Sequence, residues 1–483
     1  MNRRFLAVLL AVLTAFAMIS TSCSSKNSSD TGGDDSKKPS EDAAPALLKV
    51  PQRYKTIQAA VDAAKPGDMI LINEGVYKEA VDVTTENLTI RGMDRNKVIL
   101  DGEFKLENGI RVLDAKSVVI ENMTARNYTS NGFFWTGVDG YRGSYLTAYR
   151  NGDYGIYAFD SYNGQIDNSY GSGSPDAGFY IGQCYPCNAL IDNVVSEYNG
   201  LGYSGTNSGG DLSIVNSTFR YNRAGIVPNS GSYELCYPSR GTSIVGNLVY
   251  SNNGYDNPGI SVSLLAQGNG ILVAGAVQTD VERNRVWDHE RTGIGLVPFP
   301  EEDANDLAPS HDSWTTPCSE TRDVKVDPIP TDKCKSVDGL LKGCVVFWNP
   351  FDNTVVGNVV SESGAGDLAV GTVDLLQTGE TTDKLNNKFC DNTFSTSAPA
   401  NLEVLSPCDG TGSGNWADSP LDLIGLMGNP APKPPDGTYK KTPVPEAQES
   451  MTAPETLPTG GPFTGPKKID LAAIKVPDKP QES

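Results

Sequence analysis

The central part of the chain repeats one short pattern of apolar and polar positions. Each copy has an apolar stretch, then an Asn, then a second short apolar stretch, as in residues 118–127, 190–199 and 212–222. Apolar and polar residues alternate with a period of two within these stretches. This period predicts β-strands with one buried face, because successive side chains of a strand point to opposite sides.

The repeated Asn gives the length of one unit. These anchor positions, of which one is Tyr145 instead of Asn, fall at 122, 145, 168, 193, 216, 247, 284, 358 and 392. The first four steps are 23, 23, 25 and 23 residues, and the longer later steps indicate insertions. A unit this short cannot bury its own apolar face, whereas units stacked head to tail can, so the pattern predicts a parallel solenoid. A propeller or a sandwich would need antiparallel hairpins, which this spacing does not favour. The Asn residues are expected to have structural roles, in hydrogen-bonded ladders or in left-handed corners.

A second strand follows a Gly in each unit and places candidate core and surface residues. Ile156, Phe179 and Ile226 fall at equivalent positions, and we expect them to stack in one inward column. Period-two alternation then points Tyr157 and Tyr180 outward.

Residues 54–79 connect the repeat to a known fold. Thr56 suits a helix N-cap, alanines follow at positions 59, 60, 63 and 64, and Pro66-Gly67 would end the helix. This segment resembles the N-terminal cap of pectin-lyase-like right-handed parallel β-helix proteins (NosD-like, or the carbohydrate-binding-and-hydrolysis branch). The resemblance covers roughly residues 50–410. It implies an all-β chain, a single-stranded right-handed parallel β-helix (solenoid) with a short N-terminal capping helix.

The resemblance implies little about function, because this fold carries lyases, hydrolases, epimerases, adhesins and periplasmic maturation factors. The Gly-His-Gly motif of polygalacturonase-like members and the Asp-Pro-His-type motif of alginate epimerase-like members are both absent from the sequence, and no convincing pectate-lyase-like Ca²⁺ site is found. The NosD branch implies a copper-related role, but the 2 His and 7 Met form no clustered motif.

The stacking pattern itself offers a candidate site. Asp153 and Asp176 are one unit apart, so we expect them on adjacent turns. There, two carboxylates raise the pKa of one of them or share a cation, for which Ca²⁺ is the candidate. Outward Tyr157 and Tyr180 beside them suit a sugar platform, with ring faces on C–H surface and carboxylates on hydroxyls. The alternative is that the Asp residues serve turns and the Tyr residues pack under a loop.

His289 is a third catalytic candidate. A lone His beside Glu290 could be a general base, and the alternative is a surface His in a turn.

The net charge limits the classes of partner that the protein can bind. The chain carries −20 overall, and the segment 50–428 carries −21. Nucleic acid is therefore excluded as a main partner, because like charges repel. We expect a polysaccharide or another cell-envelope component instead.

The N-terminal segment predicts export. Arg3 and Arg4 precede an apolar run over 5–19, which is short for a spanning helix, and Cys23 follows in a sequence that resembles a bacterial lipobox. We expect residues 1–22 to be a lipoprotein signal peptide and Cys23 to be lipidated, with an ordinary secretory cleavage site as the alternative. Residues 23–49 would be a disordered tether, and the protein would be anchored to the outer face of the bacterial cell membrane.

The eight other cysteines suit disulfides in an exported protein. Sequence proximity favours Cys390–Cys408 and Cys334–Cys344. Cys184 and Cys187 are interpreted as a local disulfide, with a redox pair or a metal site as alternatives.

Three further segments complete the domain organisation. The β-helix domain is expected over 50–428, with a disulfide-pinned loop inserted near 298–343. Residues 429–483 hold 12 of the 31 prolines and are predicted to be a Pro-rich, disordered tail.

Two function classes remain open from sequence. The first is a surface protein that binds polysaccharide or another ligand without catalysis, which the missing motifs favour. The second is a polysaccharide-active lyase, hydrolase or epimerase that uses the Asp/Tyr face. No cofactor is required by either, apart from the possible Ca²⁺.

Overall fold

The computed structural model describes residues 45–302, 318, 335–338, 342–364, 372–415, 430–458 and 461–480. Pro45–Ser483 form one compact unit. The predictions for the signal peptide, for Cys23 and for most of the tether lie outside the described residues. The Cys334–Cys344 pairing lies outside them as well, because neither side chain is described.

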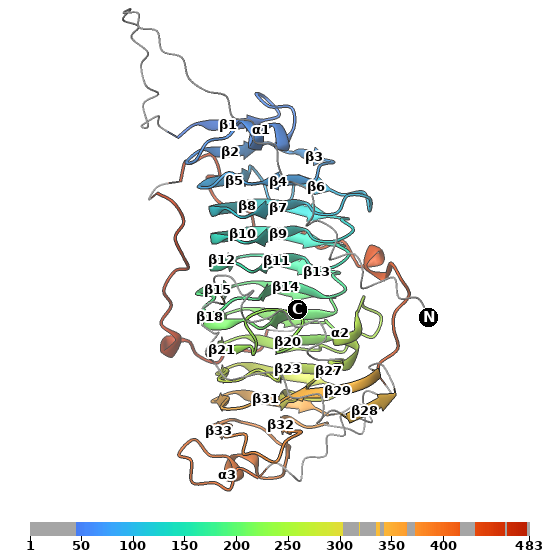
Figure 1. Ribbon diagram of the computed structural model, residues 1–483. Helices are drawn as coiled ribbons and strands as arrows, with labels where there is room; N and C mark the ends of the chain where they lie inside the picture. Colours follow the sequence, from blue (N-terminus) through green and yellow to red (C-terminus); the bar gives the residue numbers. More distant parts are fainter. Residues whose placement is uncertain are drawn as a thin grey trace, which may run out of the picture. The chain divides into compact units, whose positions relative to one another are not determined.

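Strands pair in parallel with the strands one turn earlier and one turn later. Ile156 of β11 (Ile156–Phe159) is opposite Phe133 of β9 (Phe133–Thr136) and opposite Phe179 of β14 (Ala177–Gly182). Each turn adds strands to a 20-stranded sheet, called sheet A here, and one strand to an 11-stranded sheet, called sheet B. The stacked turns are visible in Figure 1. This arrangement confirms the predicted parallel solenoid.

Sheet A consists of β1 (Leu47–Val50), β2 (Met69–Ile72), β3 (Gly75–Tyr77), β5 (Leu88–Gly92), β6 (Val98–Asp101), β8 (Lys116–Arg126), β10 (Asp139–Tyr149), β12 (Tyr162–Asp167), β13 (Tyr170–Ser172), β15 (Ala189–Asp192), β16 (Val195–Glu197), β18 (Gly209–Val215), β19 (Thr218–Arg220), β21 (Arg240–Val245), β22 (Leu248–Tyr250), β24 (Asp280–Glu282), β25 (Arg285–His289), β30 (Thr354–Val356), β31 (Val359–Ser363) and β33 (Lys388–Cys390). Sheet B consists of β4 (Val81–Val83), β7 (Ile110–Leu113), β9, β11, β14, β17 (Leu201–Thr206), β20 (Ala224–Asn229), β23 (Asn269–Ala274), β26 (Ile294–Val297), β32 (Leu375–Gln377) and β34 (Ser397–Ala398).

A short helix covers the N-terminal end of the stack, as predicted. Helix α1 (Ile57–Ala63) begins after Thr56, whose hydroxyl accepts a hydrogen bond from the Ala59 N–H at 3.1 Å. Its apolar side includes Ile57, which is fully buried. The β-helix body starts slightly earlier than the predicted residue 50, because β1 pairs with β2.

The core column was predicted correctly. Ile156, Phe179 and Ile226 each have 0% exposure, and Tyr203 joins the same column between the last two. Because the side-chain period of a strand is two, this agreement sets the inward or outward direction of neighbouring residues in sheet B.

The Asn anchors take both predicted structural roles, the left-handed corner and the hydrogen-bonded ladder. Asn168, Asn193 and Asn216 have positive φ of 49°, 55° and 49°, which is the left-handed corner conformation. From Asn247 onward the anchor lies inside the stack. There Asn247 donates to the side-chain oxygen of Asn284 at 3.0 Å, and the same bond recurs along Asn284, Asn358 and Asn392.

Three disulfides are found among the described residues: Cys184–Cys187, Cys236–Cys318 and Cys390–Cys408. The first confirms the local disulfide and the third confirms the predicted pairing. Cys236–Cys318 ties the insertion near 298–343 to the loop that precedes β21, in agreement with a disulfide-pinned loop. The described parts of this insertion and its flank form an antiparallel sheet of β27 (Phe299–Glu302), β28 (Lys335–Asp338) and β29 (Lys342–Trp348).

Two short elements remain in the body. Helix α2 (Ser261–Leu265) belongs to an insertion between β22 and β23, and α3 (Leu402–Leu405) follows β34. None of the helices in the described ranges is long and apolar enough to cross a membrane.

The prediction of a disordered C-terminal tail is wrong for the described residues. Residues 442–458 and 461–480, called the C-terminal strap here, are extended and bound along sheet A. The short 3₁₀ turn η4 (Thr438–Lys441) precedes the strap, and η5 (Leu471–Ala473) lies within it. Arginine side chains of the stack donate hydrogen bonds to strap carbonyls, namely Arg91 to Pro454, Arg95 to Glu449, Arg150 to Thr442, Arg283 to Ile474 and Arg285 to Pro477. A Pro-rich segment leaves its carbonyls free of regular secondary structure, so they accept bonds from these arginines.

Candidate functional site

The two predicted aspartates lie on adjacent turns, at the approach to sheet B. The Asp176 N–H donates to the Asp153 carbonyl at 3.2 Å, and the Asp153 N–H donates to the Ser130 carbonyl at 2.9 Å. Both side chains are half-buried. The predicted column is therefore present.

The two predicted tyrosines are opposite each other in sheet B but are less accessible than expected. Tyr157 of β11 pairs with Tyr180 of β14. Tyr157 stacks with Phe134 at 4.7 Å and with Tyr154 at 4.3 Å between ring centroids, so other rings occupy its faces. Tyr180 is only 1% exposed. The expectation of exposed ring faces is wrong for Tyr180, because a loop covers it.

The covering loop contributes a carboxylate that the sequence did not indicate. The loop consists of residues 230–239, which precede β21. The Tyr180 hydroxyl lies 2.8 Å from both side-chain oxygens of Glu234 in this loop and donates a hydrogen bond to them. Glu234 lies outside the repeat, so no periodicity could place it. Its position depends on long-range contacts of the loop.

Those contacts hold the loop firmly. The Asn207 side chain donates to the carbonyls of Gly231 and Glu234 at 2.6 and 2.8 Å. The Leu235 N–H donates to the Gln183 side chain at 2.9 Å. The adjacent Cys236 is in the disulfide to Cys318. The loop is thus fixed at both sides of Glu234.

A second tyrosine hydroxyl joins the aspartates. The Tyr154 hydroxyl donates to Asp176 Oδ2 at 2.6 Å. We call Asp153, Asp176 and Glu234, with Tyr154 and Tyr180, the carboxyl cluster. Its tyrosines bring hydroxyl groups to the carboxylates, while their rings pack on one another and on Tyr157.

Burial changes the protonation of all three carboxyl groups. It raises the pKa of Asp153 to about 6. Burial and the nearby charge of Asp153 raise the pKa of Asp176 to about 7, although the hydrogen bond from Tyr154 lowers this pKa. Burial raises the pKa of Glu234 to about 8. The hydrogen bond from Tyr180 lowers this pKa, and the nearby charge of Asp176 raises it further. Near neutral pH the cluster therefore holds both protonated and ionised carboxyl groups.

The cluster contains proton donors and acceptors but no large set of metal ligands. Ca²⁺ takes six to eight oxygen ligands, and within the described ranges no group of three or more His, Cys, Asp or Glu side chains is placed to hold a metal ion. Ca²⁺ binding at Asp153 and Asp176 stays a prediction.

His289 lies away from solvent and has a structural position. Its ring is 1% exposed, and its Nε2 is 3.2 Å from the side-chain nitrogen of Asn252. Asn252 belongs to an internal ladder with Asn222 and Asn199. Burial lowers the pKa of His289 to about 3. The interpretation as a surface His is wrong, and a buried neutral ring in this ladder has no access to a substrate.

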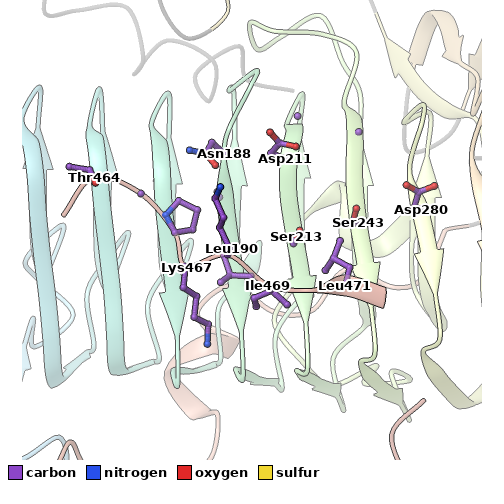
Figure 2. A pocket seen from close by; sticks show the side chains of 16 residues that line it. Asn188, Leu190, Asp211, Ser213, Ser243, Asp280, Thr464, Lys467, Ile469 and Leu471 are labelled. Atoms are coloured by element: carbon purple, nitrogen blue, oxygen red, sulfur yellow. The ribbon is translucent and has the colours of Figure 1, made fainter. Parts of the chain in front are cut away.

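A separate cavity of about 780 Å³ lies between sheet A and the C-terminal strap. Figure 2 shows strap residues Thr464, Lys467, Ile469 and Leu471 crossing the strands that carry Leu190, Ser213 and Ser243. The Lys467 ammonium contacts Asp192 at 2.5 Å. The strap residues themselves fill much of this face, so the cavity is a gap along a packed segment rather than an open cleft.

Comparison with known proteins agrees with this architecture. The family model described as "Right handed beta helix region" matches residues 74–247. The protein is a right-handed parallel β-helix. No curated protein matches its sequence.

The β-helix is also similar to several solved structures. The A-module of mannuronan C-5 epimerase AlgE4 from Azotobacter vinelandii is 14% identical, with 70% of this chain and 90% of that chain covered and a TM-score of 0.40. The periplasmic alginate epimerase AlgG is 13% identical, with 73% and 84% covered and a TM-score of 0.41. An alginate lyase from Paenibacillus sp. is 14% identical, with 73% and 96% covered and a TM-score of 0.39.

Proposed function

We propose that this β-helix is a polysaccharide-active enzyme that works by proton transfer in the carboxyl cluster. The observation that carries the proposal is the contact of Asp176 and Glu234 with the hydroxyls of Tyr154 and Tyr180, with the half-buried Asp153 one turn before Asp176. Two of these carboxyl groups come from successive turns of a rigid stack, and the third comes from a fixed loop. Such groups are held in place before a substrate arrives, which favours catalysis.

The environments assign different roles to the carboxyl groups. With a pKa of about 8, Glu234 is mainly protonated at pH 7 and suits a general acid. With a pKa of about 6, Asp153 is mainly ionised at the same pH and suits a general base. Carboxyl groups whose surroundings separate their pKa values are typical of acid–base pairs. Asp176, hydrogen-bonded to Tyr154, would position the pair and adjust its charge.

Polysaccharide is the substrate class that suits the place of the cluster. The site lies on the outer side of parallel strands, where successive turns repeat at ~4.8 Å and present a long surface. Carboxyl and phenol groups offer hydrogen bonds to sugar hydroxyls. Export, which the N-terminal segment predicts, would bring the chain to cell-envelope and external polysaccharides.

A non-catalytic binding role is the second candidate, and one contact favours it. The Tyr180 hydroxyl donates to both oxygens of Glu234. A closed pair of this kind also serves simply to hold the loop over sheet B. The protein would then bind a surface ligand without changing it.

An assay of binding and product formation separates these candidates. The purified protein is incubated with a panel of neutral and acidic polysaccharides, and both retention and new reducing or unsaturated ends are measured. We expect new ends, with a bell-shaped pH profile whose limbs fall near pH 6 and pH 8, because Asp153 must be ionised and Glu234 protonated. Glu234→Gln should reduce the rate by about 10²- to 10⁴-fold.

Asp82→Asn is the matched control. Asp82 is in sheet B on the same outward side, two turns before Phe134, and its ion pair with Arg111 is solvent-exposed. This variant should keep full activity. Retention without new ends would favour the binding role, and neither retention nor new ends on any polysaccharide would overturn the proposal.

A further inference from the structure

Two tyrosines lie at corner positions where the backbone favours other residues. In sheet A the C-terminal parts of β8, β10, β13, β16, β19, β22 and β25 pair side by side. One residue at or directly after the end of each of these strands takes the left-handed conformation. Tyr198 has φ of 60° and Tyr221 has φ of 55°. The equivalent corners of the surrounding turns are filled by Asn127, Arg150, Gly173, Ser251 and Asp288. Asn, Asp and Gly tolerate this conformation best, and a larger residue such as Arg or Tyr adopts it at a cost in backbone energy. A reason other than the backbone is therefore needed for two consecutive tyrosines.

The core does not supply that reason. Tyr221 is 38% exposed and Tyr198 is half-buried. Their rings stack on each other at 5.7 Å with an angle of 19° between their planes. Side chains that leave the stack at a corner contribute no core packing, so the pair forms an aromatic surface toward solvent.

The insertion after β22 forms a cavity over this aromatic pair. It brings Tyr255, which is also 38% exposed, together with the polar side chains of Asn253 and Asp256. The cavity has about 500 Å³, which is within the range of small-ligand sites. It is therefore lined by aromatic rings and by hydrogen-bonding groups.

The insertion is held in a fixed position beside the pair. The Asn257 side chain donates to the Tyr221 carbonyl at 2.6 Å. The fully buried Arg223 donates to the Asn257 carbonyl at 3.0 Å and to the Gln267 side chain at 2.8 Å. The cavity is thus shaped before any ligand binds, which reduces the ordering cost of binding.

Charge restricts the ligand class. Two arginines lie beside this cavity. Arg220 is paired with Glu197 at 2.6 Å and donates to the Tyr250 hydroxyl at 2.9 Å, and Arg223 donates to the Asn257 carbonyl and the Gln267 side chain. The exposed Asp256 adds negative charge to the rim. An anionic ligand would therefore meet a carboxylate, with the guanidinium groups of Arg220 and Arg223 already engaged.

We propose that Tyr198, Tyr221 and Tyr255 form a binding site for a neutral saccharide, separate from the carboxyl cluster. The aromatic rings would cover the C–H faces of a sugar, while Ser251, Asn253 and Asp256 bind its hydroxyls. The site adds a place of glycan attachment on another face of the β-helix. It does not depend on the carboxyl cluster being catalytic.

Calorimetric titration of the full-length protein with defined hexasaccharides tests this site. The probes are cellohexaose, maltohexaose, mannohexaose and xylohexaose, with hexagalacturonate as the anionic comparison. At least one neutral probe should bind more tightly than hexagalacturonate. The double variant Tyr198→Asn/Tyr221→Asn should lose at least about tenfold in affinity, which corresponds to the loss of aromatic contact with the sugar. Its melting temperature should stay unchanged or rise, since Asn suits the left-handed corner.

Tyr145→Asn is the matched control. Tyr145 also has a left-handed backbone, with φ of 52°, at a different corner of the stack. This variant should bind as the wild type does. Because Tyr198→Asn/Tyr221→Asn leaves Asp153, Asp176 and Glu234 unchanged, a loss of affinity in the double variant separates this site from the carboxyl cluster. The proposal is overturned if no neutral probe binds, if hexagalacturonate binds more tightly, or if the double variant binds as well as the wild type.

Discussion

Replacement of Phe179 by Ala tests the packing on which the whole site depends. Phe179 has 0% exposure and stacks between Ile156 and Tyr203 on the adjoining turns. Its ring reaches across the interior toward Gly171, where an added Cβ would lie 3.2 Å from the ring. Neighbouring turns are fixed by parallel hydrogen bonding and cannot collapse into the space. We therefore expect a loss of about 3–5 kcal/mol in the free energy of unfolding.

Phe159→Ala is the matched control for this measurement. Phe159 is in the neighbouring strand β11, points outward and is half-buried, with its ring 5.9 Å from that of Tyr157. It should cost less than about 1.5 kcal/mol, because no internal cavity forms. Chemical denaturation of both variants and the wild type gives the comparison. A loss below about 1 kcal/mol for Phe179→Ala, or an equal loss in the two variants, would refute the inward assignment and with it the outward positions of Tyr157 and Tyr180.

Three other predictions concern pH, the strap and the membrane. Because the pKa values of Asp153, Asp176 and Glu234 are raised in the folded protein to about 6, 7 and 8, their contribution to stability is fully present below about pH 4 and is lost as pH rises toward 8. The melting temperature should fall as pH rises over this range. In the triple variant Asp153→Asn/Asp176→Asn/Glu234→Gln the melting temperature should depend less on pH. An equal pH dependence in the triple variant and the wild type would contradict the burial of these three groups. Ile474 packs with Leu190, Val215 and Val245, so Ile474→Asp should release residues 461–480 to protease, whereas the exposed Val444→Asp should not; equal protection of both variants would argue against the packed strap. We also propose that Cys23 is acylated, so Cys23→Ala should move the protein from the membrane fraction to the soluble fraction, and a wild-type protein without acyl mass would contradict this.

Local sequence determined the repeat and the direction of most side chains. The period of two, the spacing of the Asn anchors and the Gly before the second strand were enough to place Phe179 inward and to align Tyr157 with Tyr180. The capping helix could also be predicted from the sequence, because the Thr56 N-cap and the helix end at Pro66-Gly67 depend on interactions within a few residues. These features depend on interactions that recur at a fixed distance along the chain, and a single sequence records them directly.

The tertiary structure decided which of these residues are accessible and how they are charged. Glu234 reaches Tyr180 across 54 residues of sequence, through a loop held by Asn207 and a disulfide to Cys318. The strap reaches Arg95 across 354 residues, which reverses the expectation of a disordered tail. His289 is buried because its turn closes onto the ladder of Asn252. Insertions and the terminal segment have no period, so their contacts follow from the shape of the completed stack and not from any local pattern.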